Sequence, residues 1–160
     1  MLQIKILAVG RLKEDYWQAA GREYLKRLGR FVRIAVHEVP DEAAPEGASL
    51  AVQEQIKARE GERLLRLLKP GDHAIALDLK GRRLSSEGLA AWLGEHAVSG
   101  RSALAFCIGG SLGLSGQVLA RCQERLSLSD LTFPHQLARI ILLEQIYRAC
   151  KINAGEPYHR

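Results

Sequence analysis

A glycine-rich stretch in the last third of the chain is the first place where residue types and spacing could do chemistry. Gly109, Gly110 and Gly113 follow directly after an apolar run, with Ser111 and Leu112 between them. A Walker loop would need a Lys followed by Ser or Thr, and a dinucleotide loop would need Gly-x-Gly-x-x-Gly, so neither pattern matches. Because glycine has no Cβ, the stretch permits close backbone approach to a flat ligand, although a simple turn explains it equally well.

A second stretch combines apolar side chains with groups that form hydrogen bonds. It consists of Leu128, Ser129, Asp130, Leu131, Thr132 and Phe133. Hydroxyl and backbone groups among apolar walls are typical of small-cofactor pockets, and these could bind the edge of an adenine ring. Composition alone leaves a strand followed by a turn as an equal alternative.

His135 and Arg139 follow this stretch and lie four residues apart. On a helix that begins near His135 they would share one face. A helix N-terminus carries a partial positive charge, so such a face favours an anion.

Other familiar kinds of site find little support. The histidines, at 37, 73, 96, 135 and 159, lack metal-ligand spacing, and the three cysteines are widely separated. We therefore predict no metal site, and reduced cysteines that are either buried apolar filler or a reactive thiol. The acidic residues Asp130, Glu144 and Glu156 are scattered and no Gly-x-Ser-x-Gly motif is present, which argues against hydrolysis.

The positive charge is concentrated at the start of the chain. The formal net charge is +5, and residues 1–33 alone contain eight Lys or Arg against three acids. A basic patch on an otherwise balanced protein favours a polyanion such as nucleic acid, while a solvated helix face is the open alternative.

The length and the apolar pattern indicate one α/β domain. No apolar run approaches the ~20 residues of a membrane span, and the start lacks the features of a signal peptide, so we expect a cytoplasmic protein. Apolar runs alternate with helical periodicity, which is typical of βαβ units and a mostly parallel sheet flanked by helices. The predicted strands are 3–9, 31–39, 74–79, 103–108 and 131–133, and the predicted helices are 15–28, 49–68, 86–97, 115–125 and 135–152. The last helix is apolar around most of its circumference, so we expect it to pack against a second chain in a homodimer.

Taken together, the motifs of the whole chain resemble a known family, the bacterial 23S rRNA pseudouridine-N3 methyltransferases of the small SPOUT class. The matching segments are Leu7–Gly10, Glu38–Pro40, Leu84–Gly88, Ile108–Gly110, Gly113–Leu114, Leu126–Ser129, Leu131–His135, Glu144–Gln145, Tyr147–Ala149 and Pro157–His159. No single segment is specific, but the combination is.

The resemblance implies a single SPOUT methyltransferase domain over 1–160, with a trefoil knot at about 103–155, that forms a homodimer and binds S-adenosyl-L-methionine. The implied cofactor-binding residues are Leu77, Gly109 and Gly110, with Leu128, Ser129, Asp130, Leu131, Thr132 and Phe133. The implied substrate-positioning and proton-transfer residues are His135, Arg139, Tyr158, His159 and Arg160, the tail reaching across the dimer.

The same resemblance implies the substrate. This is 23S rRNA in the assembled 70S ribosome, methylated at N3 of a pseudouridine. The basic start of the chain then becomes the expected phosphate contact, through Arg11, Lys13, Arg22 and Lys26. Two alternatives stay open: a dimeric RNA- or ribosome-binding factor without catalysis, and a nucleotide-binding enzyme of ordinary doubly wound topology.

Overall fold

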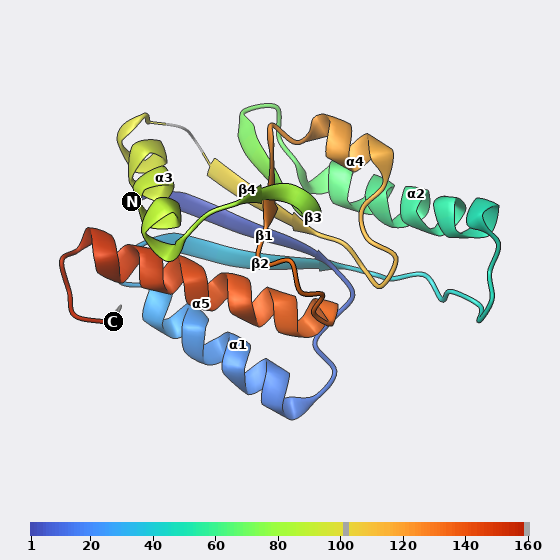
Figure 1. Ribbon diagram of the computed structural model, residues 1–160, viewed down its shortest axis with the longest axis horizontal. Coiled ribbons are helices and arrows are strands. Elements are labelled where there is room, and N and C mark those ends of the chain that lie inside the picture. The colour runs from blue at the N-terminus through green and yellow to red at the C-terminus, as the bar shows by residue number, and fades with distance from the viewer. Residues whose placement is uncertain (101–102, 159–160) are drawn as a thin grey trace.

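The computed structural model describes residues 1–100 and 103–158. Its centre is one sheet of five parallel strands in the order β2-β1-β4-β3-β5 (Figure 1). The strands are β1 (Gln3–Val9), β2 (Arg33–Val39), β3 (Asp72–Arg83), β4 (Ala103–Ile108) and β5 (Glu124–Ser127). The predicted α/β class with a parallel sheet is confirmed.

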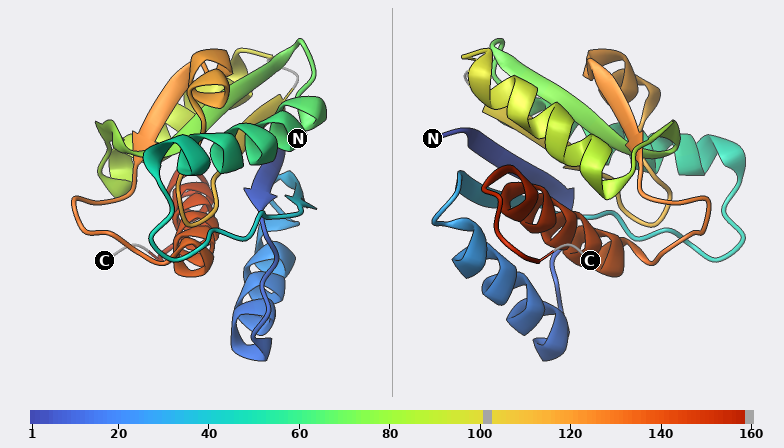
Figure 2. Two further views of the ribbon diagram at one scale, coloured as in Figure 1. Left: turned by 90° about the vertical axis from the view of Figure 1, so that its right-hand side faces the viewer. Right: turned by 60° about the vertical axis from the view of Figure 1, so that its left-hand side comes forward.

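Five helices cover both faces of this sheet (Figure 2). They are α1 (Asp15–Leu28), α2 (Leu50–Leu67), α3 (Ser86–Val98), α4 (Gly116–Arg121) and α5 (His135–Asn153). One apolar core joins the sheet to α1, α3 and α5, and a smaller one joins the other face to α2 and α4. A parallel sheet buried on both faces explains why β4 is buried along its whole length.

Serine hydroxyls fix the starts of three helices. Ser49, Ser85 and Ser115 each accept a hydrogen bond from the backbone N–H three residues later, at the starts of α2, α3 and α4. Such caps satisfy an amide that would otherwise lack a partner in the first turn. Ser49 and Ser115 are the first residues of the predicted helices 49–68 and 115–125, and Ser85 directly precedes the predicted helix 86–97.

The chain departs from the prediction around its last strand. We predicted a strand at 131–133, but those residues form a loop, and β5 lies earlier, at Glu124–Ser127. The predicted helix 115–125 accordingly ends at Arg121. The misplacement has a physical cause: β5 is an edge strand with only β3 as neighbour, so just Leu126 and Ser127 are buried and no apolar run marks it.

The pairing of β3 with β5 is interrupted by a bulge. The register passes from Leu77 opposite Leu126 to Arg82 opposite the same residue. Gly81 lies in the interruption, and a Cβ there would come within 2.6 Å of the backbone N of Leu126. Only glycine permits this close backbone approach.

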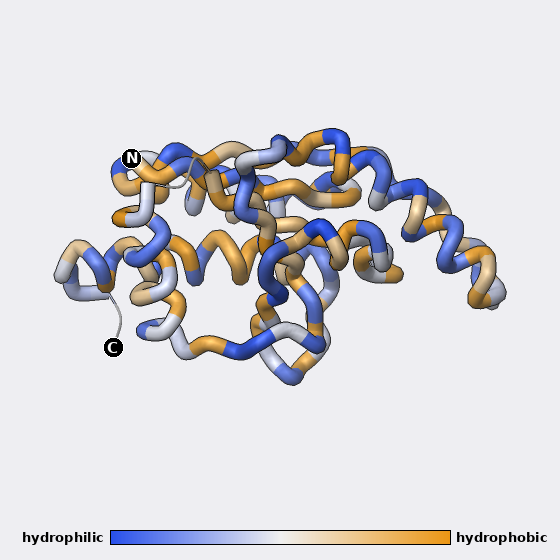
Figure 3. Tube along the Cα trace, turned by 90° about the horizontal axis from the view of Figure 1, so that it is seen from above, coloured by the Kyte–Doolittle hydropathy of each residue, from blue (hydrophilic) through white to orange (hydrophobic). Residues whose placement is uncertain are grey.

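Helix α5 is covered by the chain itself more than its sequence suggests. It lies against the sheet between α1 and α3, and Leu142, Leu143 and Ile146 are almost completely buried (Figure 1). Figure 3 shows how polar and apolar residues are distributed along the chain, with the polar ones frequent in α2. The apolar side chains around α5 are therefore mostly buried within one chain. They no longer argue for a second chain, and the homodimer stays a prediction. No helix among residues 1–100 and 103–158 is long and apolar enough to cross a membrane.

We predict that Leu142→Ala will lower the free energy of unfolding by about 2 to 5 kcal/mol, because Leu142 is fully buried and its truncation leaves a cavity. The matched control is Leu50→Ala, since Leu50 is 79% exposed, and this change should shift stability by less than about 0.5 kcal/mol. Denaturant titration of both variants gives the comparison. Equal effects would show that α5 does not pack against the sheet as described.

Candidate cofactor pocket and the residues around it

A cavity of about 420 Å³ lies at the ends of β4 and β5 and beside the middle of β3. Ligands of parallel α/β sheets bind at the carboxyl ends of strands, so this is where the fold itself places a site. Its walls come from the residues after β4, the loop after β5, the start of α5 and the middle of β3. The lining residues that the sequence predicted for the cofactor are Leu77, Gly109, Gly110, Leu128, Ser129, Leu131, Thr132 and Phe133.

The glycine stretch forms a tight turn at the mouth of β4. A Cβ on Gly109 would lie 2.5 Å from the carbonyl carbon of Gly113, and Gly113 itself has a positive φ of 89°. The turn is closed by a 3.1 Å hydrogen bond from the backbone N–H of Gly113 to the carbonyl oxygen of Gly110. Both readings of this stretch hold, since it is a turn and it also lines the cavity.

The loop after β5 is held by its own serines. The Ser127 hydroxyl donates to the carbonyl oxygen of Ser129 at 3.0 Å, and the Ser129 hydroxyl accepts from the backbone N–H of Leu131 at 3.0 Å. Asp130 is the one predicted residue of this loop that does not line the cavity. Its side chain is 77% exposed and pairs with Arg83, so its position supports a role in holding the loop rather than a ligand.

His135, the first residue of α5, lines the same cavity. Burial lowers its pKa below the ordinary value, and the positive charge of Arg139 lowers it further; Asp41 acts in the opposite direction, and Lys13 adds a smaller lowering effect. The imidazole is therefore neutral at pH 7. A neutral imidazole at the wall of a cavity is a suitable proton acceptor.

Arg139 has a different position from the one expected for a substrate-binding residue. Its side chain is 3% exposed, forms an ion pair with Glu38, and donates a 2.9 Å hydrogen bond to the carbonyl oxygen of Gly10. It thus ties α5 to the ends of β1 and β2. The side chain does not line the cavity, although Ala138 beside it does.

Tyr158 packs against the second half of α5. Its hydroxyl donates to a carboxylate oxygen of Glu144 at 3.2 Å, and its ring contacts Tyr147 and Arg148. Glu144 lies nine residues after His135, which corresponds to about 14 Å along the helix axis. Tyr158 is therefore remote from the cavity of its own chain. The other predicted tail residues, His159 and Arg160, lie outside the described residues.

The four predicted RNA-contacting cations are all exposed to solvent. They are Arg11 and Lys13 in the segment between β1 and α1, and Arg22 and Lys26 on α1. Lys13 is close enough to His135 for its charge to affect the histidine pKa. The basic segment therefore extends to the vicinity of the cavity.

Several cavity residues were not predicted. Apolar walls also come from Ile108, Leu114, Leu119, Leu126 and Ala138, and the rim from Asp78, Leu79, Lys80, Ser111 and Leu112. Residues 78–80 lie inside β3, so no strand end marks them. Leu114 and Leu119 carry no such signal, because their contribution depends on how the segment after the glycine turn folds back.

The whole chain is similar to known proteins. Residues 2–159 match the family model described as "Predicted SPOUT methyltransferase". The chain belongs to the SPOUT methyltransferase family. Proteins named "Ribosomal RNA large subunit methyltransferase H" are similar over nearly their whole length: the Pelotomaculum thermopropionicum protein is 55% identical, covering 99% of both chains. The Carboxydothermus hydrogenoformans protein is 54% identical over 99% of this chain and 100% of its own.

We predict that an NMR titration will find the pKa of His135 below its ordinary value of 6.5. Lys13→Gln should raise this pKa, because it removes a positive charge that disfavours the imidazolium. The control is Arg22→Gln, which removes an exposed positive charge of the same basic segment that has no part in the shift. A His135 pKa above 6.5, or one indifferent to Lys13, would contradict the described environment.

Proposed function

We propose that this chain transfers a methyl group from S-adenosyl-L-methionine to rRNA of the large ribosomal subunit, at N3 of a pseudouridine in 23S rRNA. The observation that carries the proposal is the cavity at the ends of β4 and β5 in a SPOUT methyltransferase, formed in large part by the glycine turn and the loop 128–133. The names of the similar proteins support rRNA as the substrate.

The cavity suits the cofactor in size and chemistry. Its volume of about 420 Å³ falls within the ~300 to 1,000 Å³ of small-molecule sites. Leu77, Leu126 and Leu128 supply apolar walls for the adenine ring, and the turn at Gly109 presents backbone groups without side chains. These residues would hold the cofactor.

S-adenosylmethionine supplies an electrophilic methyl carbon with a good, neutral leaving group. The protein then has two tasks: to hold the acceptor nitrogen in line with that carbon, and to take the proton that N3 must lose. His135 is the residue best placed for the second task, because it is neutral and lines the cavity. Arg139 contributes indirectly, since its contacts with Glu38 and Gly10 fix the start of α5.

A homodimer would complete the site. Within one chain Tyr158 contacts Glu144, which is about 14 Å along α5 from His135, so we propose that the tail that includes His159 and Arg160 acts on the cavity of a second chain. A groove beside the cavity could receive a partner. Its volume is about 310 Å³ and its apolar walls include Leu84, Phe133 and Ile141. We further propose that the backbone at about 103–155 is knotted, as in the resembling family.

The rRNA would be bound through its phosphates by the exposed cations of the chain start, in the 70S ribosome and hence in the cytoplasm. Lys13 lies near His135 at the cavity, Arg11 precedes it by two residues, and Arg22 and Lys26 are exposed on α1. Phosphate contacts of this kind position a nucleic acid without reading its sequence.

The decisive experiment combines cofactor binding with mapping of the methylated nucleotide. We expect the wild-type protein to bind S-adenosylmethionine in a calorimeter and to restore the methylated pseudouridine, found by mass mapping of rRNA, to ribosomes that lack it. Gly109→Ala should weaken cofactor binding roughly tenfold or more, since its Cβ would collide with Gly113.

Gly116→Ala is the matched control, because a Cβ at Gly116 meets nothing within 4 Å and binding should be unchanged. Absence of binding by the wild type would refute the proposed cofactor. Binding of ribosomes without any methylation would favour the non-catalytic RNA-binding factor instead.

We also predict that charge reversal at Arg22 and Lys26 will weaken ribosome binding and reduce its salt dependence. Each lost phosphate contact should lower the slope of log affinity against log salt by roughly 0.7 to 0.9. The control reverses Arg59 and Arg66, which are exposed on α2 at the opposite face of the sheet and should leave the slope unchanged. Equal effects of the two pairs would place the RNA surface elsewhere.

A further inference from the structure

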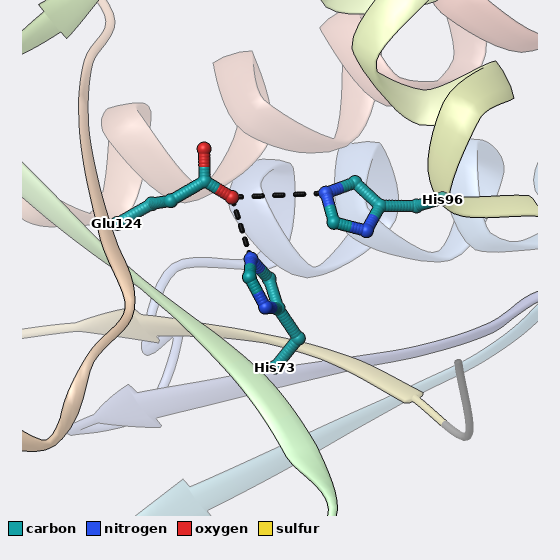
Figure 4. A group of neighbouring side chains, drawn as sticks. All are labelled: His73, His96 and Glu124. Carbon is teal, nitrogen blue, oxygen red and sulfur yellow. Dashed lines mark hydrogen bonds and ion pairs between the residues drawn. The ribbon is translucent and has the colours of Figure 1, made fainter. Parts of the chain in front are cut away.

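Two histidines and a glutamate meet outside the cofactor pocket, at the amino ends of β3 and β5 (Figure 4). His73 comes from β3, His96 from the last turn of α3 and Glu124 from the first residue of β5. The Nε2 atoms of His73 and His96 lie 2.5 and 3.7 Å from the same carboxylate oxygen, Oε2 of Glu124. Three donor atoms from three elements thus converge on one point.

The neighbouring side chains hold Glu124 in this orientation. Trp92 donates its indole N–H to both carboxylate oxygens at 3.1 Å, and Arg82 donates to Oε1 at 2.9 Å. Arg82 therefore leaves Oε2 as the oxygen that faces the histidines. The Trp92 ring also packs on His96, with a centroid distance of 4.5 Å, so the same residue positions two of the three side chains.

The pairing of β3 with β5 brings His73 into place beside Glu124. The backbone N–H of Ala74 donates to the side-chain oxygen of Gln123 at 2.7 Å, and the backbone N–H of Gln123 donates to the carbonyl oxygen of Ala74 at 2.9 Å. This reciprocal pair fixes His73 and Glu124, which are the adjacent residues, side by side. The position of Glu124 is thus reinforced by contacts from Trp92, Arg82 and the Ala74–Gln123 pair.

The donor types and distances are close to those of a zinc site. Zinc bonds to imidazole nitrogen and carboxylate oxygen at about 2.0 to 2.2 Å, which places neighbouring tetrahedral ligands about 3.3 Å apart. The two observed separations, 2.5 and 3.7 Å, lie on either side of this value. A small shift of the Glu124 carboxylate from His73 toward His96 would bring both nitrogen–oxygen separations closer to the value for a zinc site.

Glu124 is also the most accessible of the three side chains. Its side chain is 26% exposed while those of His73 and His96 are 10% and 9% exposed, so an ion can enter from the carboxylate side.

We propose that His73, His96 and Glu124 bind one divalent transition-metal ion, with zinc as the physiological candidate and water completing the coordination. Mg²⁺ and Ca²⁺ prefer oxygen ligands and should not compete. The site departs from the expectation of no metal, which rested on sequence spacing alone. It is also separate from the proposed methyl transfer, because His73 lies about 13 Å along β3 from Leu77 at the cofactor cavity.

The expected role of the ion is to clamp the fold. It would join β3, α3 and the edge strand β5, which is four residues long. The test is a titration of the metal-free, tag-free protein with Zn²⁺ in competition with a chromophoric chelator. We expect one ion per chain and a Tm that rises with zinc concentration, because the ion binds only the folded chain.

His73→Gln and His96→Gln should each weaken zinc binding at least tenfold, whereas His37→Gln, at an exposed histidine of β2, is the matched control and should not. Should either variant fail to fold, X-ray absorption of the zinc-loaded wild type decides, with two imidazole ligands expected. No saturable binding, affinity unchanged in both variants, or a zinc environment without two imidazoles would overturn the proposal. Mg²⁺ in place of Zn²⁺ should leave the Tm unchanged.

Discussion

The structure depends on the pairing of β3 with the edge strand β5. β5 has four residues and one neighbour, yet the loop that follows it supplies one wall of the cofactor cavity and leads directly into α5. A short edge strand has few ladder hydrogen bonds, so its position must be reinforced by other contacts. The Gln123–Ala74 pair does this at one end, and the close approach of Gly81 to Leu126 does it at the other.

A second constraint acts on α5, whose first turn carries His135. Arg139 pairs with Glu38 and with the carbonyl oxygen of Gly10, and these groups belong to the carboxyl ends of β2 and β1. A buried arginine requires such partners, because an uncompensated guanidinium would be strongly destabilising. The ion pair and the hydrogen bond offset the cost of burying this charge. The same contacts fix the start of α5 relative to the strand ends, and with it the imidazole that lines the cavity.

Local patterns were sufficient to predict most elements but not the strand that matters most. Apolar periodicity and capping serines located four strands and four helices within a few residues, since those elements bury whole faces. β5 reads Glu-Arg-Leu-Ser, which is polar because one side of an edge strand stays open, and the β-prone residues 131–133 attracted the prediction instead. The residue types of the loop 128–133 indicated a cofactor pocket and a strand with a turn equally, and the family resemblance favoured the pocket, while Asp130 shows that a motif residue can face away from the cavity.

The cluster of His73, His96 and Glu124 could not have been found from spacing. These residues are 23 and 28 positions apart and lie on a strand, a helix and another strand, so only the crossing order of the sheet brings them together. His73 and Glu124 lie at the amino ends of β3 and β5, whereas the candidate cofactor cavity lies at the carboxyl ends of β4 and β5. One edge of the sheet can therefore be stiffened without placing any group near the transferred methyl. A contact that holds the start of β5 still acts on the cavity, since this strand is only four residues long and its end carries the cavity wall.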